Sequence, residues 1–573
     1  MQAPDDQFHQ TLDSLNQAGR QFVESLLLQW SGQSNTESAT ILAAMAVSIK
    51  ADPARWEAMQ QHYYGEQLKL WQRLAQGETT PAAEEPDRRF RAPEWHELPY
   101  FDYLRQSYLL NARWLQDMAA ALPLAGQAKK RLDFFTRQII DAAAPANFAA
   151  TNPEVLKLAG ESNGESLRRG MALLNEDIRK NRITMCDEEA YEIGRNIAVT
   201  PGEVVFENEL MQLIQYRPQT DTVFALPLVI VPPCINKYYI LDLQPDNSLV
   251  RFAVETGHTV FMVSWRNVPP ELGHITWDQY IDLGVISAIR VAREICGAEQ
   301  INTLGFCVGG TLLAAALAVL HAKGERPAAS ATLLATMLDF SDAGELSVFV
   351  DAEYVAQREA QYAGGGVMQG RELAMTFASL RANDLIWNYV VNSYLKGRKP
   401  AAFDLLYWNS DSTNLPGAMY SYYVRNTYLE NNLCVPGRLS MCGVPVDLSR
   451  LDLPVYVMAS REDHIVPWRT AWQNTRLLGG ENSFVLAASG HIAGVINPAS
   501  KNKRHYWTGR SAADNADVWL DAAERHPGSW WTHWTHWLGA RAGARITAPQ
   551  ATGSATHPPL EAAPGRYVRQ RDD

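Results

Sequence analysis

The sequence predicts an α/β protein, in which a mostly parallel sheet with helices on both faces follows a helical N-terminal domain. Two observations lead to this prediction. Short apolar runs alternate with helical patterns from about residue 222 onward, as they do in a parallel sheet that is covered on both faces. One of these runs ends at a cysteine between glycines, Cys307, which leads directly into an apolar helix. The first observation gives the fold class, and the second indicates where the sheet carries a reactive group.

Residues 1–195 are predicted to form the helical domain. Amphipathic stretches rich in Gln and Trp occupy the first 80 residues or so, and a break with two prolines and acidic residues follows at 79–86. Aromatic residues at helical spacing return at 100–110, and no strand alternation is convincing before about residue 200.

Residues 196–573 are predicted to form the sheet domain. Its apolar strand candidates are residues 223–233, 259–265, 301–304, 331–336, 454–460 and 483–488. The long segment between about 340 and 445 is too long for a structureless loop, so we expect a cap or lid insertion. Residues from about 540 to 573 are rich in Ala, Pro, Gly and Arg, which predicts a C-terminal tail that is flexible or packed only locally.

Composition excludes some functions. The formal net charge of −12 argues against nucleic acid as a partner, because phosphate binding needs a basic face. Six scattered cysteines without a C-x-x-C pair disfavour structural zinc and a disulfide framework, although Cys434 and Cys442 are close enough to pair in principle. No signal peptide and no apolar stretch long enough to span a bilayer are recognisable, so we expect a cytoplasmic protein without a transmembrane segment.

Cys307 lies in the sequence Gly-Phe-Cys-Val-Gly-Gly at 305–310, between a strand candidate and a helix. This arrangement is the nucleophile elbow of the α/β-hydrolase fold, with a thiol in place of the usual hydroxyl. The glycines permit a tight turn, and the start of the following helix favours the thiolate. The alternative is that Cys307 is simply a small buried apolar residue.

A nucleophile at an elbow needs a base and an acid, which follow it in the chain in the order acid, then histidine. Asp463 and His491 each follow a strand candidate, so both should lie at the edge of the sheet that presents Cys307. Glu462 is the alternative acid, and His464 is better placed to support the site than to act as its base. His533 and His536 have metal-ligand spacing but no nearby third ligand, so we predict a packed C-terminal helix and no metal site.

The chemistry that these residues predict is acyl transfer. His491, oriented by Asp463, would deprotonate Cys307, and the thiolate would attack an acyl carbonyl. The oxyanion donors should be the backbone N–H groups of Val308 and, in the loop after the first parallel strand, of Ile235. A cysteine that attacks a thioester makes another thioester, which keeps the acyl group energised and favours a transferase over a hydrolase.

Several motifs together resemble those of the polyhydroxyalkanoate (polyester) synthases. They are residues 232–242, 264–267, 305–310, 407–411 and 490–498, and the resemblance covers about residues 85 to 570. Length and single-chain form resemble class I, which implies polymerisation of short-chain (R)-3-hydroxyacyl-CoA, such as 3-hydroxybutyryl-CoA, without a cofactor. Class II, which favours medium chains, stays open, as does the role of the first 80 residues.

The resemblance also implies roles for single residues and partners. Cys307 would carry the growing polyester, and His491, with help from Asp463, would also activate the 3-hydroxyl of the next unit. Asp242 would be structural, and Trp408 would belong to a cap segment associated with dimer contacts and with access to the site. A homodimer at the surface of polyester storage granules, with granule-coating proteins as further partners, is implied.

The phosphates of CoA call for basic residues at an entrance. The candidates in the predicted cap are Arg381, Lys396, Arg398 and Lys399, although exposed basic side chains are usually only solvated. Two competing functions stay open: a cysteine-dependent acyl-CoA thioesterase or esterase of the same fold, and a non-catalytic protein that coats granules.

Overall fold

The computed structural model describes residues 35–80, 86–509 and 513–571. Its contacts divide the chain into two compact units. The helical unit comprises Met1–Asp187 and Phe377–Ala401, and the sheet unit comprises Glu188–Thr376 and Ala402–Asp573.

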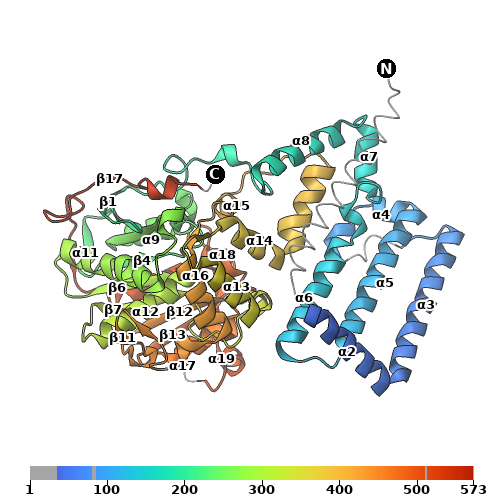
Figure 1. Ribbon diagram of the computed structural model, residues 1–573. Helices are drawn as coiled ribbons and strands as arrows, with labels where there is room; N and C mark the ends of the chain where they lie inside the picture. The colour runs from blue at the N-terminus through green and yellow to red at the C-terminus, as the bar shows by residue number, and fades with distance from the viewer. Residues whose placement is uncertain (1–34, 81–85, 510–512, 572–573) are drawn as a thin grey trace. The chain divides into compact units, whose positions relative to one another are not determined.

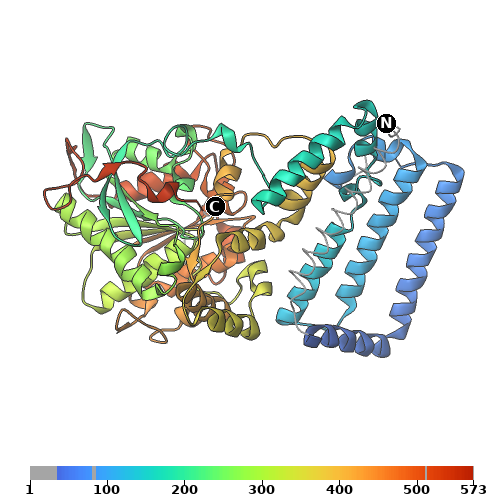
Figure 2. The same cartoon turned by 45° about the horizontal axis from the view of Figure 1, so that its top comes forward.

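The helical unit consists mainly of helices (Figures 1 and 2). They are α2 (Asn35–Ala51), α3 (Pro53–Gln76), α4 (Glu94–Glu97), α5 (Pro99–Ala121), α6 (Gly126–Ala142), α7 (Pro153–Glu161), α8 (Glu165–Lys180) and the π-helices η10 (Asn383–Trp387) and η11 (Val390–Leu395). The start of α3 is fixed by Asp52, whose carboxylate accepts a hydrogen bond from Arg55 N, and its end by Gly77 in the left-handed conformation.

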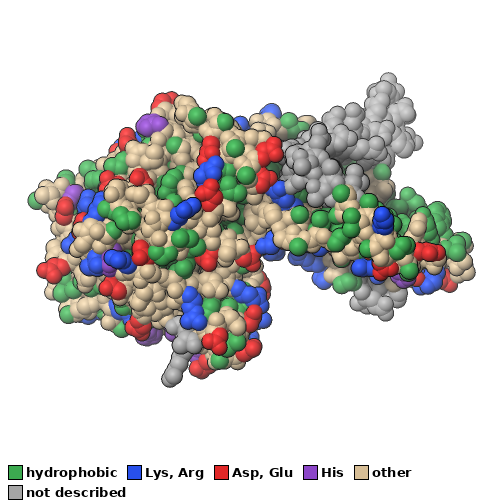
Figure 3. All heavy atoms as spheres, turned by 60° about the horizontal axis from the view of Figure 1, so that its bottom comes forward, with side chains coloured by type: hydrophobic (Ala, Val, Ile, Leu, Met, Phe, Trp, Pro, Cys, Tyr) green, Lys and Arg blue, Asp and Glu red, His purple; other side chains and the backbone are tan. Residues whose placement is uncertain are grey.

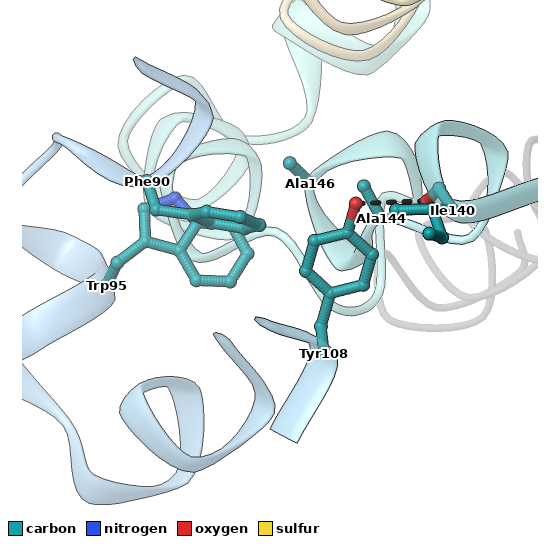
Figure 4. Packing of buried hydrophobic residues seen from close by; sticks show 6 residues of the cluster. All are labelled: Phe90, Trp95, Tyr108, Ile140, Ala144 and Ala146. Carbon is teal, nitrogen blue, oxygen red and sulfur yellow. Dashed lines mark hydrogen bonds between the residues drawn. The ribbon is translucent and has the colours of Figure 1, made fainter. Parts of the chain in front are cut away.

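Aromatic residues form one core of this unit (Figure 4). The rings of Phe90 and Trp95 meet edge to face at 4.9 Å, and the Tyr108 hydroxyl donates to the Ile140 carbonyl oxygen at 2.9 Å. Edge-to-face packing and a satisfied hydroxyl are what large aromatic side chains need when they are buried. Phe90, Trp95 and Tyr108 therefore serve packing, whereas Tyr100 is exposed.

The sheet unit is built on an eleven-stranded sheet with the order β15-β14-β13-β12-β7-β6-β4-β5-β2-β1-β17. Its central strands pair in parallel: β5 (Val260–Trp265), β4 (Leu228–Val231), β6 (Ile301–Phe306), β7 (Ala328–Leu334), β12 (Val455–Ser460) and β13 (Asn482–Ala487). Every residue of β4, β5, β6 and β12 is buried, which requires cover on both faces. The predicted fold class is thereby confirmed.

The cover comes from helices between these strands (Figure 1) and from α20, which follows β15 in the chain. They are α9 (Leu249–Glu255), α11 (Ser287–Cys296), α12 (Val308–Ala322), α17 (Trp468–Leu477) and α20 (Trp530–Gly539). The histidines of α20 belong to this packed helix, as predicted: His533 Nδ1 is bonded to the Tyr456 hydroxyl at 3.0 Å, and Trp530, Trp531 and Trp534 are buried.

The antiparallel edges of the sheet were not foreseen. One edge holds β1 (Gly202–Glu207) and β2 (Met211–Tyr216), and the other holds β14 (His505–Gly509) and β15 (Glu524–Pro527). The strands β1, β14 and β15 are partly exposed, whereas β2 is buried throughout. All four carry polar residues, so they lack the apolar runs that mark the central strands.

The segment between about 340 and 445 is not one insertion, which corrects the sequence-based expectation. Residues 377–401 belong to the helical unit, where Gln138 Nε2 donates to the Ser379 carbonyl oxygen at 2.9 Å and the Tyr394 hydroxyl donates to Asp177 at 2.6 Å. The remainder stays in the sheet unit as α13 (Ala352–Tyr362), β8 (Val367–Met368), most of α14 (Gly370–Leu380), α15 (Asp404–Asn409), β9 (Leu415–Pro416), α16 (Gly417–Val424) and the π-helix η12 (Arg425–Leu429).

Residues 540–571 also differ from the predicted flexible or locally packed tail. In the structure β16 (Arg545–Thr547) pairs with β3 (Thr222–Phe224), β17 (Glu561–Ala562) pairs with β1, and Tyr567 and Val568 are buried. Pairing with an existing strand edge uses backbone groups, so a composition rich in Ala, Pro and Gly does not reveal it.

Candidate active site

Cys307 stands in a strained turn between β6 and α12. Its backbone angles are φ +52° and ψ −127°, a conformation that side-chain-bearing residues rarely adopt. Cys307 N donates to the Leu334 carbonyl oxygen at 2.9 Å, and Cys307 O accepts from Gly310 N at 2.9 Å. These bonds hold the turn. Because Cys307 directly precedes α12, its side chain lies at the N-terminus of a 15-residue helix.

The glycines around Cys307 provide space. A Cβ on Gly309 would lie 2.3 Å from the Val231 carbonyl oxygen, and one on Gly310 would lie 2.1 Å from Thr336 Oγ1. Neither glycine has a positive φ, so the unusual backbone conformation falls on the cysteine itself. The close approach of the helix to the sheet, rather than glycine's freedom of φ, explains these two positions.

Asp463 and His491 form the second half of the site. Asp463 follows β12 and His491 follows β13, and these strands are neighbours in the sheet. Asp463 Oδ2 accepts from His491 Nδ1 at 2.7 Å, while Asp463 Oδ1 accepts from the backbone N–H groups of Ile465 and Val466 at 2.8 Å each. The carboxylate is fully buried and has three donors, whereas Glu462 is exposed.

The electrostatics of His491 follow from this geometry. Burial lowers the pKa of the imidazole, but the Asp463 carboxylate and the Cys307 thiol outweigh it and raise the pKa to about 10. The ring also stacks on Phe306, with centroids 5.6 Å apart. A carboxylate behind the imidazole and a thiol in front of it are the surroundings that stabilise an imidazolium next to a thiolate.

The two expected oxyanion donors lie on backbone that is held in place. Val308 begins α12, so its N–H belongs to the first turn, which has no acceptor within the helix. Ile235 lies in residues 232–242 after β4, which we call the oxyanion loop. Thr413 fixes this loop: its N–H donates to the Ile235 carbonyl oxygen at 2.9 Å, and its hydroxyl donates to the Cys234 carbonyl oxygen at 2.6 Å.

Trp408 and Asp242 support the same loop. The Trp408 indole N–H donates to the Lys237 carbonyl oxygen at 2.7 Å from a side chain that is 4% exposed. Asp242 is buried at the far end of the loop, where it accepts from the hydroxyls of Thr200 at 2.5 Å and Ser248 at 2.6 Å. Burial raises the pKa of the Asp242 carboxyl. Trp408 therefore holds the backbone of the loop, whereas Asp242 connects the end of the loop to two neighbouring side chains. His464 lies half-buried next to Asp463.

Sequence reasoning missed an aromatic group beside the thiol. Burial raises the pKa of the Tyr428 hydroxyl, and the charges of Cys307 and Asp463 add to this effect. The Tyr428 ring meets Phe340 at 5.0 Å and Tyr423 at 5.8 Å, both edge to face. No spacing in the sequence links these residues to Cys307, since they come from different parts of the segment that follows β7.

The four basic candidates for CoA all lie in the helical unit and not in the cap part of the sheet unit. Arg381 pairs with Asp384 at 2.8 Å, and Lys396, whose side chain is 8% exposed, pairs with Glu154 at 2.7 Å. Arg398 and Lys399 are exposed. On the face shown in Figure 3, basic side chains are interspersed with acidic ones.

Other expectations have simple outcomes. The six cysteines, Cys434 and Cys442 included, are free thiols. Within the described residues, no group of three or more His, Cys, Asp or Glu side chains could hold a metal ion. Of the described helices, none has the length and apolar character needed to cross a membrane.

Two family models match the chain, and their matches overlap at residues 227–253. Residues 86–253 match the family model described as the N-terminus of poly-beta-hydroxybutyrate polymerase (PhaC), and residues 227–498 match that of the alpha/beta hydrolase fold. The poly(3-hydroxyalkanoate) polymerase subunit PhaC of Cupriavidus necator is 52% identical over 564 residues, which cover 96% of each chain. The corresponding subunit of Rhizobium meliloti is 40% identical over 91% of this chain and 87% of its own. The poly(3-hydroxyalkanoate) polymerase of Methylorubrum extorquens is 43% identical over 86% of this chain and 82% of its own.

Proposed function

The chain belongs to the poly(3-hydroxyalkanoate) polymerase family, and from this membership we propose that it polymerises (R)-3-hydroxyacyl-CoA with release of CoA. It is an acyltransferase, and its product is a polyhydroxyalkanoate. The observation that supports the chemistry most directly is the buried Asp463–His491 pair, which follows two neighbouring strands of the sheet that presents Cys307 at its elbow.

The first step loads the enzyme. His491, held by Asp463, takes the proton of Cys307, and the thiolate attacks the thioester carbonyl carbon of the substrate. The bond between this carbon and the CoA sulfur then breaks, and the departing CoA thiolate takes the proton from His491. The acyl group is left as a thioester on Cys307.

The second step extends the chain. The 3-hydroxyl of the next hydroxyacyl-CoA gives its proton to His491, and its oxygen attacks the thioester carbonyl on Cys307. An ester bond forms, the bond to the Cys307 sulfur breaks, and the thiolate is regenerated. Thioester exchange then returns the lengthened chain to Cys307, so that no oxidant, reductant or cofactor is needed.

Both steps pass through a tetrahedral oxyanion. The N–H groups of Val308 and Ile235 are the donors that we assign to it. Loss of one such donor costs on the order of 3 kcal/mol of transition-state stabilisation.

The substrate range follows from the family and stays a proposal. Short-chain substrates such as (R)-3-hydroxybutyryl-CoA are the first choice, with medium chains as the alternative. Rates measured over a series of acyl-CoA chain lengths decide between them. A maximum at four carbons supports the short-chain assignment, and a maximum at eight or more contradicts it.

The proposed setting is the cytoplasmic surface of polyester granules, where the enzyme acts as a homodimer with granule-coating proteins as further partners. An exposed apolar stripe on α3 supports contact with a polymer surface. Tyr64, Leu68 and Trp71 have helical spacing there and are 61%, 60% and 56% exposed. Arg398 and Lys399 remain the candidates for contacts with CoA phosphates, because Arg381 and Lys396 already have carboxylate partners.

The test uses the purified protein and (R)-3-hydroxybutyryl-CoA. We expect release of free thiol together with insoluble polymer, and radiolabelled monomer attached to Cys307; Cys307→Ala should give none of these. Free thiol with only soluble hydroxy acid would show a thioesterase, and granule binding without thiol release would show a coat protein.

A further inference from the structure

The C-terminal segment, Tyr567–Arg571, lies against the oxyanion loop. It is held there by one side chain of that loop, Lys237. The Lys237 ammonium donates to the carbonyl oxygen of Val568 at 2.9 Å and also to that of Gln570. Because the Lys237 side chain is only 1% exposed, these carbonyl groups replace water around the charge.

A carboxylate compensates the buried ammonium. Asp411 Oδ1 lies 3.2 Å from Lys237 Nζ, and the Asp411 side chain is 3% exposed. The other oxygen, Asp411 Oδ2, accepts from the Tyr239 hydroxyl at 2.8 Å. Burial lowers the pKa of Lys237, and Asp411 opposes that shift. Such a pair is strongly destabilising when only one partner is removed, so the three segments that supply these groups are coupled.

Further contacts tie the C-terminal segment to the same place. Arg571 donates to the Tyr407 hydroxyl, and its guanidinium lies 5.2 Å from the Tyr407 ring centroid. The neighbouring Trp408 donates to the Lys237 carbonyl oxygen. Residues 407–413, the C-terminal segment and the oxyanion loop therefore meet at a single buried junction.

The oxyanion loop needs such support. It contains no strand, and its backbone is attached to the rest of the sheet unit through isolated bridges from Asn236 to Ser412 and from Asp242 to Ser248 and through the bonds of Thr413 and Trp408. An oxyanion donor is effective only when it is held in position before the charge develops, within a fraction of an ångström.

We propose that Lys237 is a positioning residue, which anchors the C-terminal segment to the oxyanion loop and so holds the Ile235 N–H where the tetrahedral oxyanion forms. This inference rests on the proposed function, because it assigns the support of a donor that the acyl transfer uses. Lys237 itself touches neither Cys307 nor the substrate in this mechanism.

The experiment compares two reactions of the same thiol in the full-length protein. Acyl transfer from (R)-3-hydroxybutyryl-CoA develops an oxyanion, whereas alkylation of Cys307 by iodoacetamide does not. For Lys237→Met we expect kcat to fall about 10- to 100-fold, less than the loss of a whole donor, with KM nearly unchanged. The alkylation rate should stay within about twofold of the wild-type rate, and Lys323→Met, which changes an exposed lysine of the sheet unit, should leave both rates unchanged.

A second variant tests the proposal even if Lys237→Met alone fails to fold. Lys237→Met together with Asp411→Asn removes both charges, so no unpaired buried charge remains, but the anchor to the C-terminal segment is still lost. Low turnover with normal alkylation in this double variant supports the proposal. Wild-type turnover, or an equal fall in turnover and alkylation, overturns it. A wild-type protein that releases no CoA would instead refute the proposed function.

Discussion

His491 Nδ1 and Asp463 Oδ2 lie 2.7 Å apart, and their side chains are 5% and 0% exposed. The two residues follow β12 and β13, whose parallel pairing brings the ends of these strands together. A hydrogen bond between a carboxylate and an imidazole is stronger in such a buried place than in water. Removal of the carboxylate should therefore have large and specific effects.

Asp463→Asn should lower kcat for CoA release by about 10²- to 10⁴-fold, because an amide cannot stabilise the imidazolium. This rate is measured as the free thiol released from (R)-3-hydroxybutyryl-CoA. The matched control is Glu462→Gln, next in sequence but exposed, which should stay within about twofold of wild type. Equal losses in both variants would contradict the assignment of the acid.

The stability of the protein should fall in alkali because of His491. Although burial lowers its pKa, Asp463 and Cys307 raise it to about 10, above the ordinary imidazole value of about 6.5. The folded state thus binds the proton more tightly, and this contribution is complete below pH 6.5 and is lost as pH rises through 10. Urea unfolding should show a declining free energy over this window, and a smaller decline in Asp463→Asn. If the unfolding free energies of wild type and Asp463→Asn decline equally over this window, Asp463 does not raise the pKa of His491.

His258 should lower the stability of the folded protein in acid. Its ring is 1% exposed and stacks on Phe224 at 4.7 Å, and burial, aided by Arg545, lowers its pKa to about 4. The stability associated with the neutral ring is present above pH 6.5 and is lost as pH falls through 4. His258→Phe keeps a stacked ring without a titrating group, so its unfolding free energy should fall less between pH 6.5 and 4. If the unfolding free energy of His258→Phe falls as steeply with pH as that of wild type, His258 is not the cause of the loss.

Gly309→Ala should destabilise the sheet unit by about 1–3 kcal/mol or more and reduce turnover, because the new Cβ would press on the rigid Val231 carbonyl oxygen. The control is Gly364→Ala, since a Cβ there meets nothing within 4 Å and φ is not positive. Thermal unfolding and CoA release compare the two. A Gly309→Ala protein that equals the control in both would show that the elbow has room to relax.

Much of the sheet unit could be predicted because its signals are local. The central strands are continuous apolar runs, and the elbow sequence around Cys307 combines a strand end, a helix start and small residues within six positions. Asp463 and His491 were predicted as site residues because each follows such a run. The structure then distinguishes Asp463 from Glu462 through burial, which the sequence left open.

Other parts could not be predicted because they depend on partners that are distant in the chain. Lys396 was considered for CoA, but its ammonium is bound by Glu154, which lies 242 positions away in the sequence. Residues 377–401 join the helical unit through similar bonds to α6 and α8, and their own sequence carries no sign of it.

The sequence by itself determined the fold class and the family, and it led us to propose Cys307, Asp463 and His491 as nucleophile, acid and base, because apolar periodicity and turn chemistry depend on residues that are neighbours in the chain. Only the tertiary structure decided that the end of the chain is bound to Lys237 and that Tyr428 lies near Cys307. The physical reason is that buried charges and unpaired backbone groups take whichever partner the folded chain brings within reach, however far apart the two are in sequence.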